Sequence, residues 1–267
     1  IGGGENNDAL ANFSVVSGGE YNEASGAYAA VGGGNQHTAS GTQTTIGGGN
    51  SHHAWGNLAT IGGGGDNEAG YIATVAGGSS NDATGARSVI GGGSSNDATG
   101  EFAVVPGGFS NHARGDDSFA AGRQARAKHD NTFVWSDGSA QVDSLVSTAQ
   151  SQFLISAANG VGVGTNAPAN QFHVVSSVGG SAYTMSGHVA SIENTSTSSP
   201  DVLALKIAET GDPGTGDNFL SFIDGDGDLL GEVQGNGSGG VQYKSAGADF
   251  AEMMPKRHAD EHIEPGD

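Results

Sequence analysis

Residues 17–31 read SGGEYNEASGAYAAV, and the next fifteen residues, 32–46, read GGGNQHTASGTQTTI. Both stretches have a glycine pair near the start, an alanine in the eighth place, a glycine in the tenth and a branched aliphatic residue at the end. The pattern x-G-G-x-x-N-x-A-x-G-x-x-A/S-x-V/I runs through residues 2–135, and only the copy beginning at Gly62 is one residue shorter. A fixed period of this kind predicts a repeat architecture.

Each copy predicts two short strands joined by two turns. The glycine pair, such as Gly18 and Gly19, marks a turn that needs positive φ or close backbone approach, and the single Gly26 marks the second turn. Around it, residues such as Asn22 and Ala24 alternate as in a strand of period two. Each copy is therefore one coil of a solenoid. The asparagine column predicts a stacked amide ladder formed by Asn7, Asn22, Asn67, Asn81, Asn96 and Asn111.

The inward residues make a thin core, with one valine or isoleucine per coil. Burying such a side chain contributes roughly 1.5–3 kcal/mol, whereas ordering each residue costs about 1–2 kcal/mol in backbone entropy. We therefore expect other copies of the chain to supply the missing burial in a parallel homotrimer, with the aliphatic column along a shared axis. This predicted trimer core consists of Val16, Val31, Ile46, Ile61, Val75, Ile90 and Val105.

The motif N-x-A-S-G-x-x-A-x-V-G-G-G at residues 22–34 resembles the head repeat of trimeric autotransporter adhesins, the YadA-like head, and related repeats of phage tail fibres. The resemblance covers about half of the chain. It implies an all-β, fibrous homotrimer of left-handed parallel β-rolls, followed here by a small β domain. The chain departs from that family in its 15-residue period and in lacking a heptad stalk and a membrane anchor, so the bacterial surface anchor is left open.

Composition narrows the function classes. The chain has 267 residues with 49 glycines but no G-X-Y period, which excludes collagen. It has no cysteine and no apolar run of 18 residues, and we expect none of these residues to form a signal peptide. It begins inside a repeat, so we expect it to belong to a longer protein. The net charge of −20 disfavours nucleic acid and anionic membranes as partners. The expected partners are the chain itself and a glycan or protein of a host-cell surface.

Part of the negative charge forms a column in equivalent places of successive copies: Asp8, Glu23, Glu68, Asp82 and Asp97. We interpret this column as a solvated acidic face that resists lateral aggregation. Specific Ca²⁺ sites are the alternative, although calcium needs six to eight oxygen ligands. No other cofactor is expected.

The repeat predicts four segments: a β-roll over residues 1–135, neck strands over 136–170, a small β domain over 171–245 and a tail over 246–267. Arg123, Arg126 and Lys128 form the only basic cluster, and we expect it to cover the last coil, because solenoids need a capping unit. Strands are expected at Phe133–Trp135 and Phe153–Ile155. In the small domain they are expected at residues 188–194, 202–207, 218–223 and 229–234.

Three further motifs suggest metal or nucleotide chemistry. Residues 224–228 read DGDGD, and Asp224, Asp226 and Asp228 are weak candidates for a metal site; the EF-hand pattern fails downstream, so a hairpin turn is favoured. Residues 258–262 match the H-x-x-E-H pattern of zinc hydrolases, but a solvated tail is favoured. The GVGVG segment at 160–164 departs from the dinucleotide fingerprint, and we interpret it as a strand-and-turn linker.

Histidines in the repeat have two interpretations. His37 and His52 occupy the asparagine column of adjacent coils. Three chains could gather several imidazoles into a metal site, but replacement of asparagine in the ladder is the favoured interpretation.

The variable positions of the repeat carry isolated aromatic residues, and five of them are candidates for receptor binding: Tyr21, Tyr28, Trp55, Tyr71 and Phe109. The favoured function is an adhesive, non-enzymatic homotrimeric fibre, either a phage or injection-system tail fibre or a bacterial surface adhesin, located outside the cell. The alternatives are a secreted Ca²⁺-binding β-roll and a polysaccharide-degrading tail spike, which would need paired carboxylates. An ice-binding solenoid would need threonine in one column throughout, and copies two and seven lack it.

Overall fold

The computed structural model describes residues 1–139, 144–175, 218–223, 226 and 228–245. The chain divides into two units, Ile1–Ser177 and Val178–Asp267, which are considered separately. Across the described residues the regular structure is β-strand, without helix. The expected all-β class is therefore confirmed for this part of the chain.

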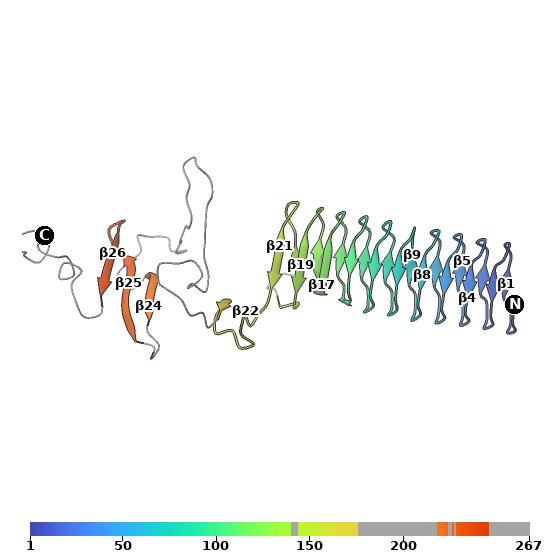
Figure 1. Cartoon of the computed structure of the whole chain (residues 1–267), viewed down its shortest axis with the longest axis horizontal. Coiled ribbons are helices and arrows are strands. Elements are labelled where there is room, and N and C mark those ends of the chain that lie inside the picture. Colours follow the sequence, from blue (N-terminus) through green and yellow to red (C-terminus); the bar gives the residue numbers. More distant parts are fainter. Residues whose placement is uncertain (140–143, 176–217, 224–225, 227, 246–267) are drawn as a thin grey trace, which may run out of the picture. The chain divides into compact units, whose positions relative to one another are not determined.

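The first unit is a stack of coils, each with one strand in each of two sheets (Figure 1). The first sheet contains β1 (Asp8–Ala9), β3 (Glu23–Ala24), β5 (Thr38–Ala39), β7 (His53–Ala54), β9 (Glu68–Ala69), β11 (Asp82–Ala83), β13 (Asp97–Ala98), β16 (His112–Ala113), β18 (Ala125–Ala127) and β20 (Leu145–Val146). The second contains β2 (Val15–Val16), β4 (Ala30–Val31), β6 (Thr45–Ile46), β8 (Thr60–Ile61), β10 (Thr74–Val75), β12 (Val89–Ile90), β14 (Val104–Val105), β17 (Phe119–Arg123), β19 (Phe133–Ser136) and β21 (Phe153–Ser156), with β15 (Gly108–Phe109) beside β17.

All strands of the stack pair in parallel with the equivalent strands of the neighbouring coils. Asp8 lies opposite Glu23, and Glu23 lies opposite Thr38. In the second sheet Val15 lies opposite Ala30, which lies opposite Thr45. The first unit is therefore a parallel β-solenoid of about 11 turns, and the expected pair of short strands per coil is confirmed.

The core of the solenoid lies inside each single coil. The side chains of Val31, Ile46 and Ile61 are at most 1 % exposed, and alanines such as Ala24 and Ala39 pack against them. This corrects the sequence argument, which placed the seven residues of the predicted trimer core on an axis between chains. Val16, Val31, Ile46, Ile61, Val75, Ile90 and Val105 are buried without any second chain, because the coils above and below cover them.

A ladder of asparagines runs beside the aliphatic column, as predicted. The Asn22 amide donates from Nδ2 to the Gly18 and Gly34 carbonyls (3.1 and 2.9 Å), and its Oδ1 accepts the backbone N–H of His37 (3.1 Å). The same contacts recur at Asn96 and Asn111. The amides therefore satisfy backbone groups that turn inward at the glycine corner.

The two corners of a coil use glycine for different reasons. At the first corner the second glycine of each pair has positive φ, for example 92° at Gly19. At the second corner Gly26 has no positive φ, but a Cβ there would lie 1.9 Å from the carbonyl oxygen of Gly41. Close stacking of the coils therefore requires this glycine, and the positive φ of the second corner falls two residues later, at Tyr28 (59°).

The solenoid continues past Trp135, where the sequence argument ended it. β20 pairs with β18, and β21 pairs with β19. Arg126 lies in β18 inside the first sheet, opposite His112 and Val146. The boundary expected at residue 135 had made the basic cluster a cap of the stack. The structure instead places it within the stack, because further strands pair beyond it.

Two smaller sheets follow. In the first unit β22 (Val161–Val163) pairs in parallel with β23 (Phe172–Val174). In the second unit β24 (Asn218–Ile223), β25 (Leu229–Gly235) and β26 (Val241–Ser245) form an antiparallel sheet. The strands expected at 218–223 and 229–234 are confirmed. Those expected at 188–194 and 202–207, and the motif at 258–262, lie outside the described residues.

Candidate functional site

The five aromatic residues proposed for receptor binding are all exposed, but they do not converge on one site. Their side chains are between 41 % exposed, at Trp55, and 56 % exposed, at Tyr28. Tyr21 and Phe109 lie near the glycine-pair corner, whereas Tyr28 lies at the second corner. Trp55 follows β7. Tyr71 lies two residues before Ala73, which is buried. The solenoid therefore displays these side chains at several places along its surface.

The second corner carries a larger set of exposed apolar side chains than the sequence analysis found. One residue per coil has φ between 54° and 62° there, and we call this column the corner ridge. Phe13 and Tyr28 stack with ring centroids 4.9 Å apart. The residues of the corner ridge are Phe13, Tyr28, Gln43, Leu58, Ile72, Arg87, Phe102, Asp117, Asn131 and Ser151.

Bulky residues are costly at such a position. Positive φ is uncommon for side chains other than glycine and is an outlier for a β-branched one such as Ile72, at 56°. Held strain of this kind costs on the order of 1–3 kcal/mol per residue and often coincides with functional positions. From Tyr28 onward, each residue of the ridge donates a backbone hydrogen bond to the preceding coil, for example from Leu58 N–H to the Thr42 carbonyl (2.9 Å). Large side chains therefore stay exposed at fixed intervals.

Arg87 links the ridge to neighbouring aromatic rings. Its guanidinium lies 5.2 Å from the ring centroid of Phe102 and 6.0 Å from that of Tyr71, and it forms an ion pair with Glu101. Both members of the ion pair are well exposed, so the pair adds little stability. The stacking of the guanidinium on the rings instead fixes the orientation of two aromatic faces.

Trp55 lies against the shorter coil. Thr60 pairs with Thr74, and Glu68 pairs with Asp82, so one residue is missing between these coils relative to their neighbours. A Cβ at Gly70 would lie 3.1 Å from Cζ2 of Trp55. The indole thus lies over the glycine that precedes Tyr71, and the irregular coil brings the two aromatic residues to the same part of the surface.

The outward positions of the first sheet carry the acidic column. Asp82 lies between Glu68 and Asp97, and burial together with these two neighbours raises the pKa of its carboxyl. Burial would also raise the pKa of Asp97, but hydrogen bonds from His112 and Arg114 outweigh it and lower that pKa. His112 Nδ1 lies 3.2 Å and Arg114 Nη2 lies 3.0 Å from Asp97 Oδ2. The Arg114 guanidinium therefore balances the charge at one end of this column.

Groups of three or more histidine, aspartate or glutamate side chains that could hold a metal ion do not occur within the part of the chain that the structure describes. Of the weak metal candidates, Asp226 lies in a turn and Asp228 precedes β25, between two antiparallel strands, as the hairpin interpretation expects. Asp224 lies outside the described residues.

His37 and His52 lie inside the solenoid and continue the asparagine ladder. Their rings stack 4.8 Å apart, and each Nδ1 accepts a backbone N–H from the next coil, that of His52 or of Asn67 (3.1 and 3.2 Å). Because Nδ1 accepts, the hydrogen of each neutral ring is on Nε2. Burial and the His52 ring lower the pKa of His37 to about 4. The imidazoles thus replace asparagine, as the favoured interpretation held.

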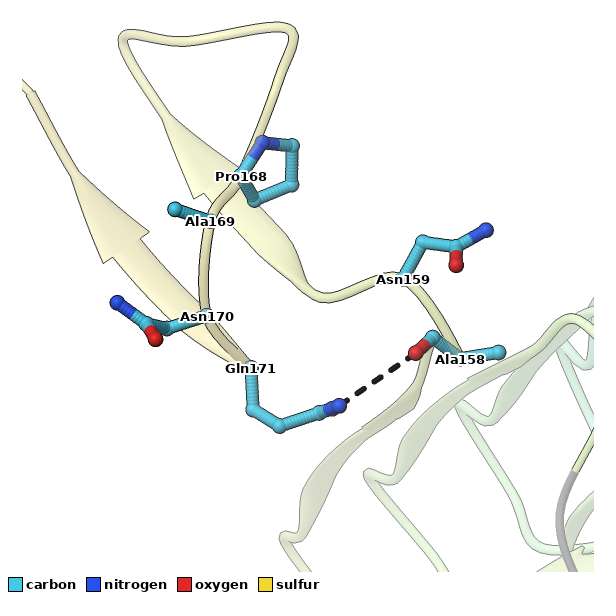
Figure 2. Close-up of a pocket in the computed structure, with 6 residues that line it drawn as sticks. All are labelled: Ala158, Asn159, Pro168, Ala169, Asn170 and Gln171. Atoms are coloured by element: carbon cyan, nitrogen blue, oxygen red, sulfur yellow. Dashed lines mark hydrogen bonds between the residues drawn. The ribbon is translucent and has the colours of Figure 1, made fainter.

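One open pocket of about 460 Å³ lies between the residues after β21 and the loop before β23 (Figure 2). Gln171 reaches across it and donates from Nε2 to the Ala158 carbonyl (3.4 Å). None of its lining side chains is ionisable, so the pocket provides no acid, base or nucleophile. The lining residues are Ala158, Asn159, Pro168, Ala169, Asn170 and Gln171.

No protein-family model matches this chain. No curated protein matches it significantly either. Over the described residues, no helix has the length and apolar character needed to cross a membrane. The resemblance to adhesin heads and tail fibres therefore rests on the repeat motif itself.

Proposed function

We propose that this chain is the structural and adhesive part of an extracellular homotrimeric fibre, either a phage or injection-system tail fibre or a bacterial surface adhesin. Each chain contributes a left-handed roll of 15-residue repeats, and the fibre attaches to a glycan or protein of a host cell or surface. The observation that carries the proposal is a continuous parallel β-solenoid that displays large aromatic side chains at several places along its surface.

The stack is suited to holding a ligand-binding surface away from its point of attachment. Neighbouring coils are joined by backbone hydrogen bonds at strands and at corners, for example from Tyr28 N–H to the Asn12 carbonyl and from Phe102 N–H to the Ala86 carbonyl. A solenoid joined in this way gains length by adding coils, and each coil contacts only its neighbours. The display therefore does not depend on a conformational change.

The surface around the short coil has the composition of a binding surface. Tryptophan, tyrosine and arginine are the residues enriched in binding hot spots. Here Trp55, Tyr71 and Arg87 lie on successive coils, and Leu58 and Phe102 belong to the same corner ridge as Arg87. Exposed aromatic faces favour sugar rings or apolar side chains as ligands. A fibre of three chains would repeat this surface, so weak single sites would gain strength by avidity.

Binding measurements with matched variants test the proposal. Fluorescently labelled full chain is added to bacterial and eukaryotic cells and to a glycan array, beside the double variant Trp55→Ala, Tyr71→Ala. Thr84→Ala, Thr99→Ala is the control, because Thr84 and Thr99 lie on the same side of later coils. We expect at least a tenfold loss of binding in the aromatic variant alone. Equal binding by all three proteins would contradict the proposed surface.

The same preparations test the tail-spike alternative. Each surface polysaccharide is incubated with the chain, with and without Ca²⁺ or Zn²⁺, and new reducing ends are measured. The adhesive proposal expects binding without release of reducing ends, and metal-dependent release would favour the enzyme instead.

A further inference from the structure

We propose that copies of this chain associate through the outward face of the second sheet, an inference that rests on the proposed fibre. We call this surface the uncharged face. Its first column runs through opposed residues of neighbouring coils without a gap: Val15, Ala30, Thr45, Thr60, Thr74, Val89, Val104, Phe119, Phe133 and Phe153. Its second column lies two residues further along each coil: Ser17, Gly32, Gly47, Gly62, Ala76, Gly91, Pro106, Ala121, Trp135 and Ile155.

Charge separates the two sheets. Neither column of the uncharged face contains an ionisable side chain over ten coils, in a chain whose net charge is −20. The corresponding outward column of the first sheet is mostly charged or titratable: Asp8, Glu23, Thr38, His53, Glu68, Asp82, Asp97, His112, Arg126 and Val146. Two faces of the same coil, built from the same repeat, thus differ completely in electrostatic character.

The uncharged face is also flat, regular and partly apolar. A Cβ at Gly32 or Gly47 would lie 2.4 Å from the carbonyl oxygen of Gly47 or Gly62, respectively. The second column is therefore glycine at these coils, and no side chain projects from it there. Val89 is 40 % and Phe153 is 68 % exposed, and at that end Phe119, Phe133 and Phe153 stack with ring centroids 4.7 and 4.6 Å apart. An exposed surface with aromatic and aliphatic side chains at one end is typical of an interaction site.

A second copy of this chain fits the face best, for two reasons. Chains of like charge repel one another, and desolvating a carboxylate is costly, so close approach is favoured where no charge must be buried. Parallel copies also share the same spacing of about 4.8 Å per coil, so equivalent side chains of two copies can meet at every coil along the face. Ten coils give the face a length of roughly 45 Å, over which neither of its two columns contains an ionisable side chain.

Single-cysteine variants of the full chain give a local test, because the chain has no cysteine. Thr60→Cys is placed in the uncharged face, and Thr38→Cys is the matched control in the outward column of the first sheet. In a single chain Thr60 is exposed, whereas Thr38 is half-buried. An isolated chain would therefore react with maleimide at least as fast at position 60 as at position 38. Association through the uncharged face reverses that order.

The rate of maleimide labelling is measured for both variants in native buffer and again in denaturant, with the mass checked by light scattering. We expect labelling at position 60 to be at least tenfold slower than at position 38 in the native oligomer and equal after unfolding. Fast labelling at position 60 in a trimeric particle would overturn the assignment of the face and leave the fibre intact. A single-chain mass, whatever the labelling rates, would overturn both the assignment and the trimer.

Discussion

At the scale of single residues, stacking of the coils depends on asparagine, because its amide matches the backbone groups that turn inward at the glycine corner. Asn96 donates to the Gly92 and Gly108 carbonyls and accepts the N–H of Asn111 (2.9, 3.1 and 3.0 Å). The bond to the Asn111 N–H is buried, and the bonds to the two carbonyls are partly buried. A side chain that only filled the space would remove these contacts, although the Gly108 carbonyl would still accept the Ser94 N–H (3.0 Å).

Asn96→Ala is therefore expected to lower the free energy of unfolding by about 2–4 kcal/mol, since it takes the side-chain partner from the Asn111 N–H and from the Gly92 carbonyl. Urea denaturation followed by circular dichroism measures the change. Thr99→Ala, an exposed change in the same coil, is the control and should stay within about 0.5 kcal/mol of the wild type. Similar losses in both variants would show that the ladder is not needed for stability.

The two buried histidines make stability depend on pH. The pKa of His37 in the folded chain, about 4, lies below the ordinary histidine value of 6.5, so the unfolded chain binds its proton more tightly. Its contribution is complete above about pH 6.5 and is lost as the pH falls toward 4. The loss amounts to roughly 3 kcal/mol at most.

His37→Asn restores the residue type of the ladder and removes this titration. We expect the urea midpoint of the wild type to fall more than that of His37→Asn between pH 7 and pH 4.5. The carboxylates are common to both proteins, so their titration largely cancels in the comparison. Parallel pH profiles would mean that His37 does not titrate in the folded chain as its burial implies.

At the scale of the elements, the second corner is set by close contact between backbones. A Cβ at Gly85 would lie 2.1 Å from the Gly100 carbonyl oxygen, whereas one at Gly65 would meet nothing within 4 Å. Gly65 also lacks positive φ, and its column elsewhere holds residues such as Glu20 and Asn35. Two glycines of neighbouring coils thus have opposite tolerance for a side chain.

Gly85→Ala is expected to cost about 2–3 kcal/mol, because a rigid backbone oxygen must move to admit the methyl group. Gly65→Ala should be within about 0.5 kcal/mol of the wild type. Thermal unfolding of the two variants at one concentration makes the comparison. An equal effect of both changes would contradict the stacking that places the Gly100 carbonyl beside Gly85.

The elements show what could be predicted from the sequence and what could not. The period and alternation predicted the two strands and the asparagine ladder. They did not reveal that Ile61 is buried within its own chain, because counting large side chains ignores the cover that adjacent coils provide. The end of the stack was misjudged because Arg126 and the irregular spacing before Leu145 broke the pattern, although Phe133 and Phe153 occupy equivalent places.

The candidate surface was likewise found in part. Trp55 and Tyr71 are conspicuous because large residues interrupt a repeat made of small ones. Phe13 and Phe102 were missed because bulky residues rarely adopt positive φ, so nothing in the sequence identified their column as a corner. Phe13 lies fifteen residues before Tyr28, and Phe102 lies fifteen residues after Arg87. This spacing was the signal that could have located the ridge.

At the scale of the whole molecule, the same repeat produces two unlike faces, one charged and one uncharged. The burial of the aliphatic column within each coil removes the original reason for a trimer, and the uncharged face supplies a different one. The core of one coil is thin. Association of copies along ten coils would cover the uncharged face, which has no ionisable side chain in its two columns.

The mass of the full chain in solution tests this account most directly. Multi-angle light scattering during size-exclusion chromatography measures it without a shape assumption, which matters for an elongated particle. The account predicts a single species with three times the chain mass of 26.3 kDa, unchanged on dilution through the micromolar range. A folded species with the mass of one chain, giving the β-type circular dichroism of the solenoid, would contradict it.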